Sequence, residues 1–168
     1  MSTLEVNNIT PQSGTTLTLG GSGDTINLGS GVTASGFGKV LQVVTATDST
    51  NRTTTSGSYV TASNTLSVSI TPSSASNKVL ILLSTGGGNS GANISYYTVY
   101  RGITNLGGAE GFTQINGAIF TPVNVVYLDS PSTTSSTTYQ AYLKVSGGTG
   151  YITYNNQLSS ITVIEIKG

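Results

Sequence analysis

From about residue 39 onwards, apolar and polar residues alternate with a period of two, which is the pattern of β-strands. The clearest case spans residues 65–71, where Leu66, Val68 and Ile70 alternate with serine and threonine. This alternation predicts a strand with one face in a core and the other in water. Strands are predicted at 40–47, 59–62, 65–71, 78–85, 94–101, 112–115, 118–127, 138–146, 151–154 and 161–166.

The segment 78–83 departs from this alternation, because every residue after Lys78 is apolar. A strand with two apolar faces is either central in a two-layer fold or covered on its outer face by another subunit. For a sandwich of this size, the second interpretation fits better.

Two sequence motifs predict how the strands are connected. Asn116-Gly117 lies between two apolar segments and predicts a two-residue type I′ hairpin that places Ile115 opposite Ala118. The glycine-rich segment 86–91 predicts a flexible loop between strands, exposed at the tip of a sandwich. About eight to ten strands in some 130 residues predict an all-β, antiparallel, jelly-roll-like sandwich.

Residues 1–38 form a thinner, β-like module, in which short apolar pairs are separated by glycine. The units 16–20 and 25–29 repeat the same pattern, and the glycine-rich residues 29–38 read as a linker. We therefore expect two domains, 1–38 and 39–168. The apolar side chains that we expect to line a trimer axis or attachment interface are Leu4, Val6, Ile9, Leu17, Leu19, Ile26 and Leu28.

So few apolar side chains cannot stabilise the module alone. Burying one gains about 1.5–3 kcal/mol, whereas ordering the backbone costs about 1–2 kcal/mol for each residue. The module therefore needs other chains or a docking surface, and a disordered tail is the alternative. The chain has no cysteine for disulfides, which also points towards stabilisation by association.

Composition excludes several classes of function. Charged residues make up 7% of the chain, six of each sign, so we expect no nucleic-acid partner. The chain has no His and no Cys, and its carboxylates are scattered; we therefore expect no catalytic residues, no metal site and no cofactor. No signal-peptide pattern follows Met1 and no long apolar run occurs, so we expect neither export nor membrane insertion.

Tyrosine is the best candidate for recognition, because its ring can stack on a sugar while its hydroxyl finds a polar partner. The chain has nine Tyr residues. Tyr96 and Tyr100 are expected to share one strand face, opposite to Tyr97, and Tyr142 falls on the polar face of its strand. Tyr96, Tyr100 and Tyr142 are therefore candidate ligand-binding residues. Packing in a core or at a subunit interface is the alternative.

Two regions carry a resemblance to known proteins. Residues 4–31, LEVNNITPQSGTTLTLGGSGDTINLGSG, resemble the opening of virion appendage proteins of marine phages, notably cyanophages. The segments GKVLQV at 38–43 and ITVIEIKG at 161–168 are similar to the C-terminal head domains of such proteins. The resemblance implies a trimeric jelly roll comparable to the heads of tumour-necrosis-factor-like trimers.

We therefore expect a homotrimeric virion protein, a fibre- or knob-type appendage assembled in the host cytoplasm. Its N-terminal module would bind other virion proteins, and its head would contact the host surface, including glycans. The alternatives are a capsid decoration protein without a receptor role and a carbohydrate-binding module of a cellular protein.

Overall fold

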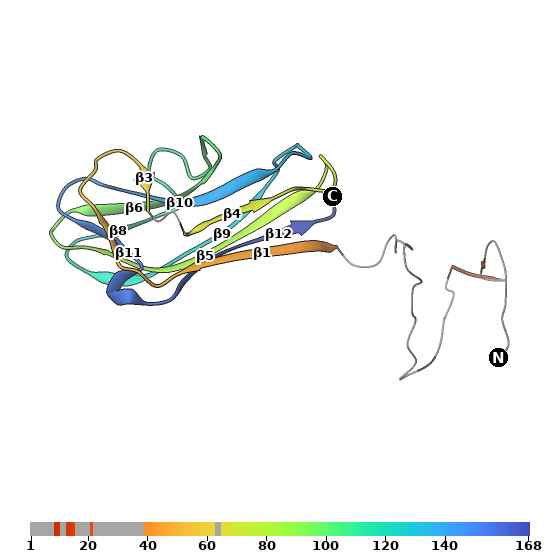
Figure 1. The fold of residues 1–168 in the computed structure, drawn as a ribbon, viewed down its shortest axis with the longest axis horizontal. Coiled ribbons are helices and arrows are strands. Elements are labelled where there is room, and N and C mark those ends of the chain that lie inside the picture. The colour runs from red at the N-terminus through yellow and green to blue at the C-terminus, as the bar shows by residue number, and fades with distance from the viewer. Residues whose placement is uncertain (1–8, 11–12, 16–20, 22–38, 63–64) are drawn as a thin grey trace. The chain divides into compact units, whose positions relative to one another are not determined.

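The computed structural model describes residues 9–10, 13–15, 21, 39–62 and 65–168. The chain divides into two units, Met1–Phe37 and Gly38–Gly168, and each is described by itself. The predicted repeats at 16–20 and 25–29 lie outside the described residues. The second unit is an antiparallel β-sandwich of two sheets (Figure 1), which confirms the predicted fold class.

The first sheet, sheet A, is organised around its longest strand, β5. Strand β9 pairs along one edge of β5, while β12 and β11 pair one after the other along the opposite edge. Strand β1 flanks β12, and β2 flanks β11. The strands of sheet A are β1 (Val40–Asp48), β2 (Arg52–Thr54), β5 (Lys78–Asn89), β9 (Phe120–Asp129), β11 (Gly150–Ile152) and β12 (Ser159–Ile166).

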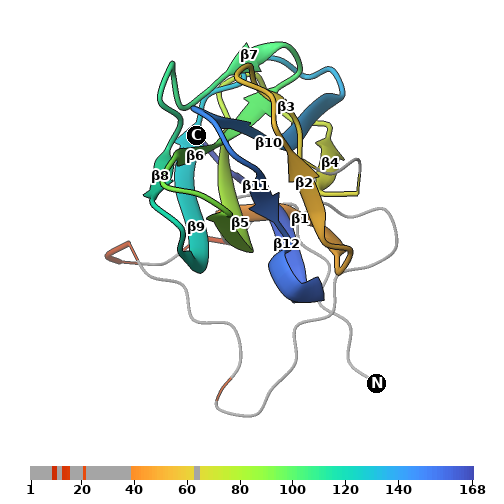
Figure 2. The same cartoon turned by 90° about the vertical axis from the view of Figure 1, so that its left-hand side faces the viewer.

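In the second sheet, sheet B, strand β10 pairs with β6 on one edge and with β3 and β4 on the other. Strands β7 and β8 pair with the free edge of β6. Its strands are β3 (Val60–Thr61), β4 (Ser67–Ile70), β6 (Ile94–Arg101), β7 (Thr104–Asn105), β8 (Thr113–Asn116) and β10 (Thr137–Val145). This strand order is jelly-roll-like, and Figure 2 shows the sandwich from its end.

The core lies between the sheets and is built by alternate residues of each strand. Leu66, Val68 and Ile70 are buried there as the alternation predicts, while the intervening serines are half-buried or exposed. Strand β5 is central in sheet A: its odd-numbered apolar residues are buried, but Leu80 and Leu82 remain partly exposed on the outer face.

The hairpin predicted at Asn116-Gly117 is wrong. Strand β8 pairs with β6, where Ile115 lies opposite Ser95, whereas β9 pairs with β5. A type I′ turn needs positive φ at both central residues, and here Gly117 has φ of 93° while Asn116 does not adopt a positive value. The segment instead carries the chain from sheet B to sheet A.

The glycines at 86–88 do not form the predicted loop, because they continue strand β5. Aromatic rings from other strands occupy the space that side chains would take. A β-carbon on Gly87 would lie 2.6 Å from the Tyr97 hydroxyl oxygen, and one on Gly88 would collide with the Phe120 ring. The Tyr97 hydroxyl accepts a hydrogen bond from the Gly88 amide at 2.7 Å. Glycine is required here for close packing and not for flexibility.

One end of the sandwich is held by the carboxylate of Glu165, which is 1% exposed. It accepts hydrogen bonds from the Gln42 amide at 2.5 Å, from the Asn77 amide at 2.6 Å and from the amide and hydroxyl of Ser73 at 2.7 and 2.8 Å. Burial alone would raise the pKa of the Glu165 carboxyl, but these donors outweigh burial and lower it below its usual value.

We expect this carboxylate to make the fold sensitive to acid. Because its pKa is lower in the folded than in the unfolded chain, its contribution to stability is full above the unfolded pKa of about 4.3 and is lost as pH falls through the folded pKa. Glu165→Gln should lower the free energy of unfolding at pH 7 by about 1–3 kcal/mol and should flatten its decline below pH 4. Urea unfolding at a series of pH values from 7 to 2.5 measures both effects. If the free energy of unfolding fell with pH in the same way for the wild type and for Glu165→Gln, this account would be contradicted.

Candidate functional site

The structure brings the three predicted tyrosines together on the outer face of sheet B. Tyr96 and Tyr100 extend from β6, and Tyr142 extends from the neighbouring β10. The rings of Tyr100 and Tyr142 are stacked, with centroids 4.0 Å apart and planes at 25°. Tyr97 points the opposite way and is fully buried in the core, as the alternation predicts.

Tyr59 and Lys144 complete this group, which we call the tyrosine cluster (Tyr59, Tyr96, Tyr100, Tyr142 and Lys144). The Lys144 ammonium lies 4.9 Å from the Tyr59 ring centroid and 4.6 Å from that of Tyr96, close enough for cation–π attraction to both. Lys144 also donates a hydrogen bond to the Ala109 carbonyl at 2.6 Å. The tyrosine cluster therefore combines partly exposed rings, hydroxyls and one cation.

The Tyr59 hydroxyl is a hydrogen-bond donor at neutral pH. Burial, followed by the negative charge of Glu110, raises the pKa of Tyr59 to about 12. The hydroxyl donates a hydrogen bond to the Ala109 carbonyl at 3.3 Å, and the same oxygen accepts the hydrogen bond from the Lys144 ammonium. These contacts anchor the cluster to the loop at 109–110.

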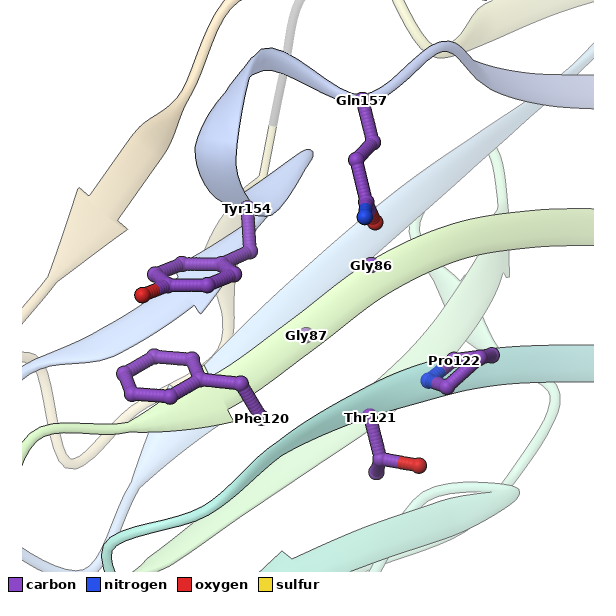
Figure 3. Close-up of a pocket in the computed structure, with 7 residues that line it drawn as sticks. All are labelled: Gly86, Gly87, Phe120, Thr121, Pro122, Tyr154 and Gln157. Carbon is purple, nitrogen blue, oxygen red and sulfur yellow. The ribbon is translucent and has the colours of Figure 1, made fainter.

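The sequence analysis missed a pocket on the outer face of sheet A, shown in Figure 3. The cavity has a volume of about 170 Å³, and Gly86 and Gly87 of β5 lie at its base. The residues that line it are Gly86, Gly87, Phe120, Thr121, Pro122, Tyr154 and Gln157. Phe120 and Tyr154 are far apart in sequence, and the glycine run resembles a loop, so no local sequence pattern indicates this pocket.

A second feature of sheet A is a group of apolar side chains on its outer face. One row of this group crosses four neighbouring strands, β1, β12, β5 and β9, where the residues in register are Val43, Ile164, Leu80 and Leu128. Leu82 and Val126 pair in a neighbouring row. We call these six residues the apolar face; Val126 is 72% exposed, Val43 57% and Leu128 52%.

The predicted attachment residues fall in the first unit. Leu4, Val6, Leu17, Leu19, Ile26 and Leu28 lie outside the described residues. Ile9 is described and is 50% exposed. Their role at an interface therefore stays a prediction.

Among residues 9–10, 13–15, 21, 39–62 and 65–168, no three Asp or Glu side chains gather in a group that could hold a metal ion. Within the same part of the chain, no helix has the length and hydrophobicity needed to cross a membrane.

Comparison with known proteins adds no assignment to this geometry. No model of a known protein family matches the chain, and a search of curated proteins finds no match either. Function must therefore be inferred from the surfaces of the sandwich itself.

Proposed function

We propose that this chain is a virion structural protein that assembles as a homotrimer and forms a fibre- or knob-type appendage contacting the host surface. The observation that carries the proposal is the apolar face of sheet A. Single exposed apolar residues are common on soluble proteins, but a row in register across neighbouring strands is characteristic of an interaction surface.

The apolar face favours a second copy of the chain as its partner. None of its six residues is charged. Around it, the outer face carries the hydroxyls of Thr45 and Thr162, which hydrogen-bond at 3.0 Å, and the Lys78 ammonium at the start of β5, which donates to the Ser130 hydroxyl at 2.8 Å. The six residues themselves offer no charge for electrostatic recognition of a different macromolecule, whereas they can pack against the same face of other copies in a symmetric ring. Burial of each large side chain would contribute about 1.5–3 kcal/mol.

Assembly through the apolar face would leave the outer face of sheet B free. That face carries the tyrosine cluster, whose rings, hydroxyls and ammonium group suit contact with surface glycans. The resemblance of residues 4–31 to phage appendage proteins supports a virion location and an attachment role for the N-terminal module. A capsid decoration protein would use the same assembly without the glycan contact.

We expect Val126→Asp to disrupt the oligomer without unfolding the chain. Val126 is 72% exposed, so a carboxylate there costs little in the single chain, but it would be buried unpaired at the proposed interface. Size-exclusion chromatography with light scattering should show a trimer for the wild type and a monomer for the variant.

Ile103→Asp is the matched control, since Ile103 is 98% exposed on the turn between β6 and β7. This variant should keep the wild-type mass. A monomeric wild-type protein would refute the proposed trimer, and an intact Val126→Asp trimer would refute the role of the apolar face. Localisation of the chain on the particle by electron microscopy then separates a fibre or knob from a capsid decoration.

A further inference from the structure

We infer that the pocket shown in Figure 3 binds one ring of a neutral saccharide. This inference deepens the proposed contact with a host surface and rests on it for its biological role. It assigns a site different from the tyrosine cluster, on sheet A. Along β5 and β9, Gly86 and Pro122 of the pocket lie four residues from Leu82 and Val126 of the apolar face, which is about 13 Å.

The base of the pocket exists because β5 has no side chain there. A β-carbon on Gly86 would lie 2.7 Å from the Gln157 side-chain oxygen and 3.6 Å from the β-carbon of Tyr154, so it would project into the space between the walls. Strand β9 supplies the opposite wall, where Phe120 pairs with Gly88 and Pro122 pairs with Gly86. The two strands thus leave an open trough whose base is backbone.

The second wall is held by an unusual turn between β11 and β12. The predicted strand 151–154 ends at Ile152, and Thr153, Asn155 and Asn156 adopt positive φ values of 55°, 55° and 58°. Left-handed backbone is rare for a β-branched residue such as Thr153, and such strain persists only where the surrounding structure imposes it. The Thr153 amide donates to the Thr85 hydroxyl at 3.1 Å, which fixes the turn to β5.

The turn places Tyr154 and Gln157 over the pocket. Tyr154 stacks on Phe120, with ring centroids 3.8 Å apart and planes at 15°, and Tyr151 packs edge-on against both rings. The aromatic wall is therefore preorganised without a ligand. Preorganised rings cost less entropy when a ligand binds, which suits weak, repeated surface contacts.

The lining determines the class of ligand. It combines aromatic rings, a proline and an amide from Gln157, and none of its seven residues is charged. A pyranose ring matches this lining because it has apolar C–H faces and hydroxyls at its rim. A cavity of about 170 Å³ is below the roughly 300 Å³ of sites for drug-sized ligands, and it is suited to a single ring. Without a cation, the site offers nothing to a carboxylated or phosphorylated sugar.

The experiment records amide chemical shifts of the full-length protein during titration with neutral methyl glycosides of glucose, galactose and mannose and with N-acetylglucosamine. Glucuronic acid is the anionic comparison. We expect saturable shifts at Gly86, Gly87, Thr121 and Tyr154 for at least one neutral sugar, in the millimolar range. Shifts confined to Tyr100 and Tyr142, or no shifts up to about 50 mM sugar, would overturn the inference.

Two variants test the pocket directly. Phe120→Ala removes part of the aromatic wall, and Gly86→Ala narrows the trough against the flexible end of Gln157; each should weaken binding at least about tenfold. Ile103→Ala, remote from the pocket, should bind like the wild type. Light scattering on the same samples reports the oligomeric state, so loss of the proposed trimer and absence of sugar binding are separate results. Equal binding by all four proteins would also refute the inference.

Discussion

Asp129→Ala is expected to lower the free energy of unfolding by about 3–5 kcal/mol, the largest effect of a single truncation that the structure suggests. Asp129 is 5% exposed and accepts hydrogen bonds from the Arg101 guanidinium at 2.8 and 2.9 Å and from the Tyr139 hydroxyl at 2.7 Å. Burial, followed by interaction with Asp129, raises the pKa of Tyr139, so its hydroxyl remains a donor. Truncation would remove the carboxylate partner of the Arg101 guanidinium, whose side chain is 26% exposed, and leave it the Ser130 carbonyl at 3.2 Å.

Urea unfolding at a fixed protein concentration measures this loss, because an oligomer makes apparent stability depend on concentration. Tyr139→Phe is the matched control: it removes one hydroxyl and keeps the ion pair, and it should cost about 1–2 kcal/mol. Asp129→Ala with stability within 1 kcal/mol of the wild type would show that Arg101 finds water or another acceptor when its partner is removed.

Gly87→Ala is expected to cost about 3 kcal/mol, although it adds a single methyl group. That methyl would lie 2.6 Å from the Tyr97 hydroxyl oxygen and 2.7 Å from Val123 Cγ2, both in the packed core. Tyr97 would have to move to relieve this clash. Its hydroxyl accepts a hydrogen bond from the Gly88 amide at 2.7 Å and donates one to the Tyr151 carbonyl at 2.8 Å, so the movement would break both. Strands β5, β6 and β11 would therefore all be disturbed.

The control for this prediction is Gly57→Ala. Gly57 lies outside the strands, and a β-carbon there would meet only the Val145 carbonyl oxygen, at an ordinary 3.8 Å. The free energy of unfolding of the Gly57→Ala variant should differ from that of the wild type by less than about 1 kcal/mol. We expect a gain, because alanine makes the unfolded chain stiffer. Thermal unfolding of the two variants separates a local steric clash from a general effect of replacing glycine, and equal melting temperatures would contradict the packing described for β5.

The sequence predicts those parts of the fold in which each residue's environment follows from its immediate neighbours. The alternation of Leu66, Val68 and Ile70 with serine depends only on the pleat of one strand, and it is confirmed. The same pleat places Tyr96 and Tyr100 on one face and Tyr97 on the other. These predictions need no knowledge of which strand pairs with which.

Predictions that required knowledge of strand pairing did not succeed. The motif Asn116-Gly117 suggests a hairpin, but the two flanking strands belong to different sheets, which local sequence does not reveal. The glycine run at 86–88 has no side chains of its own, so its buried position depends on rings supplied by Tyr97 and Phe120. The pocket was missed for the same reason, since its walls come from β9 and from the turn after β11.

The residues that line the pocket of sheet A differ in how well the fold tolerates their substitution. Its base is the backbone of Gly86 and Gly87, and Gly87 is fixed by contact with the core. By contrast, Gln157 on its wall is exposed and takes no part in the aromatic packing, and most substitutions at such surface positions alter stability by less than about 0.5 kcal/mol. Natural variation could therefore replace exposed residues around the pocket one at a time and shift the preferred ligand while the sandwich stays folded. Selection for a new host surface would then act on these exposed residues and leave the base unchanged.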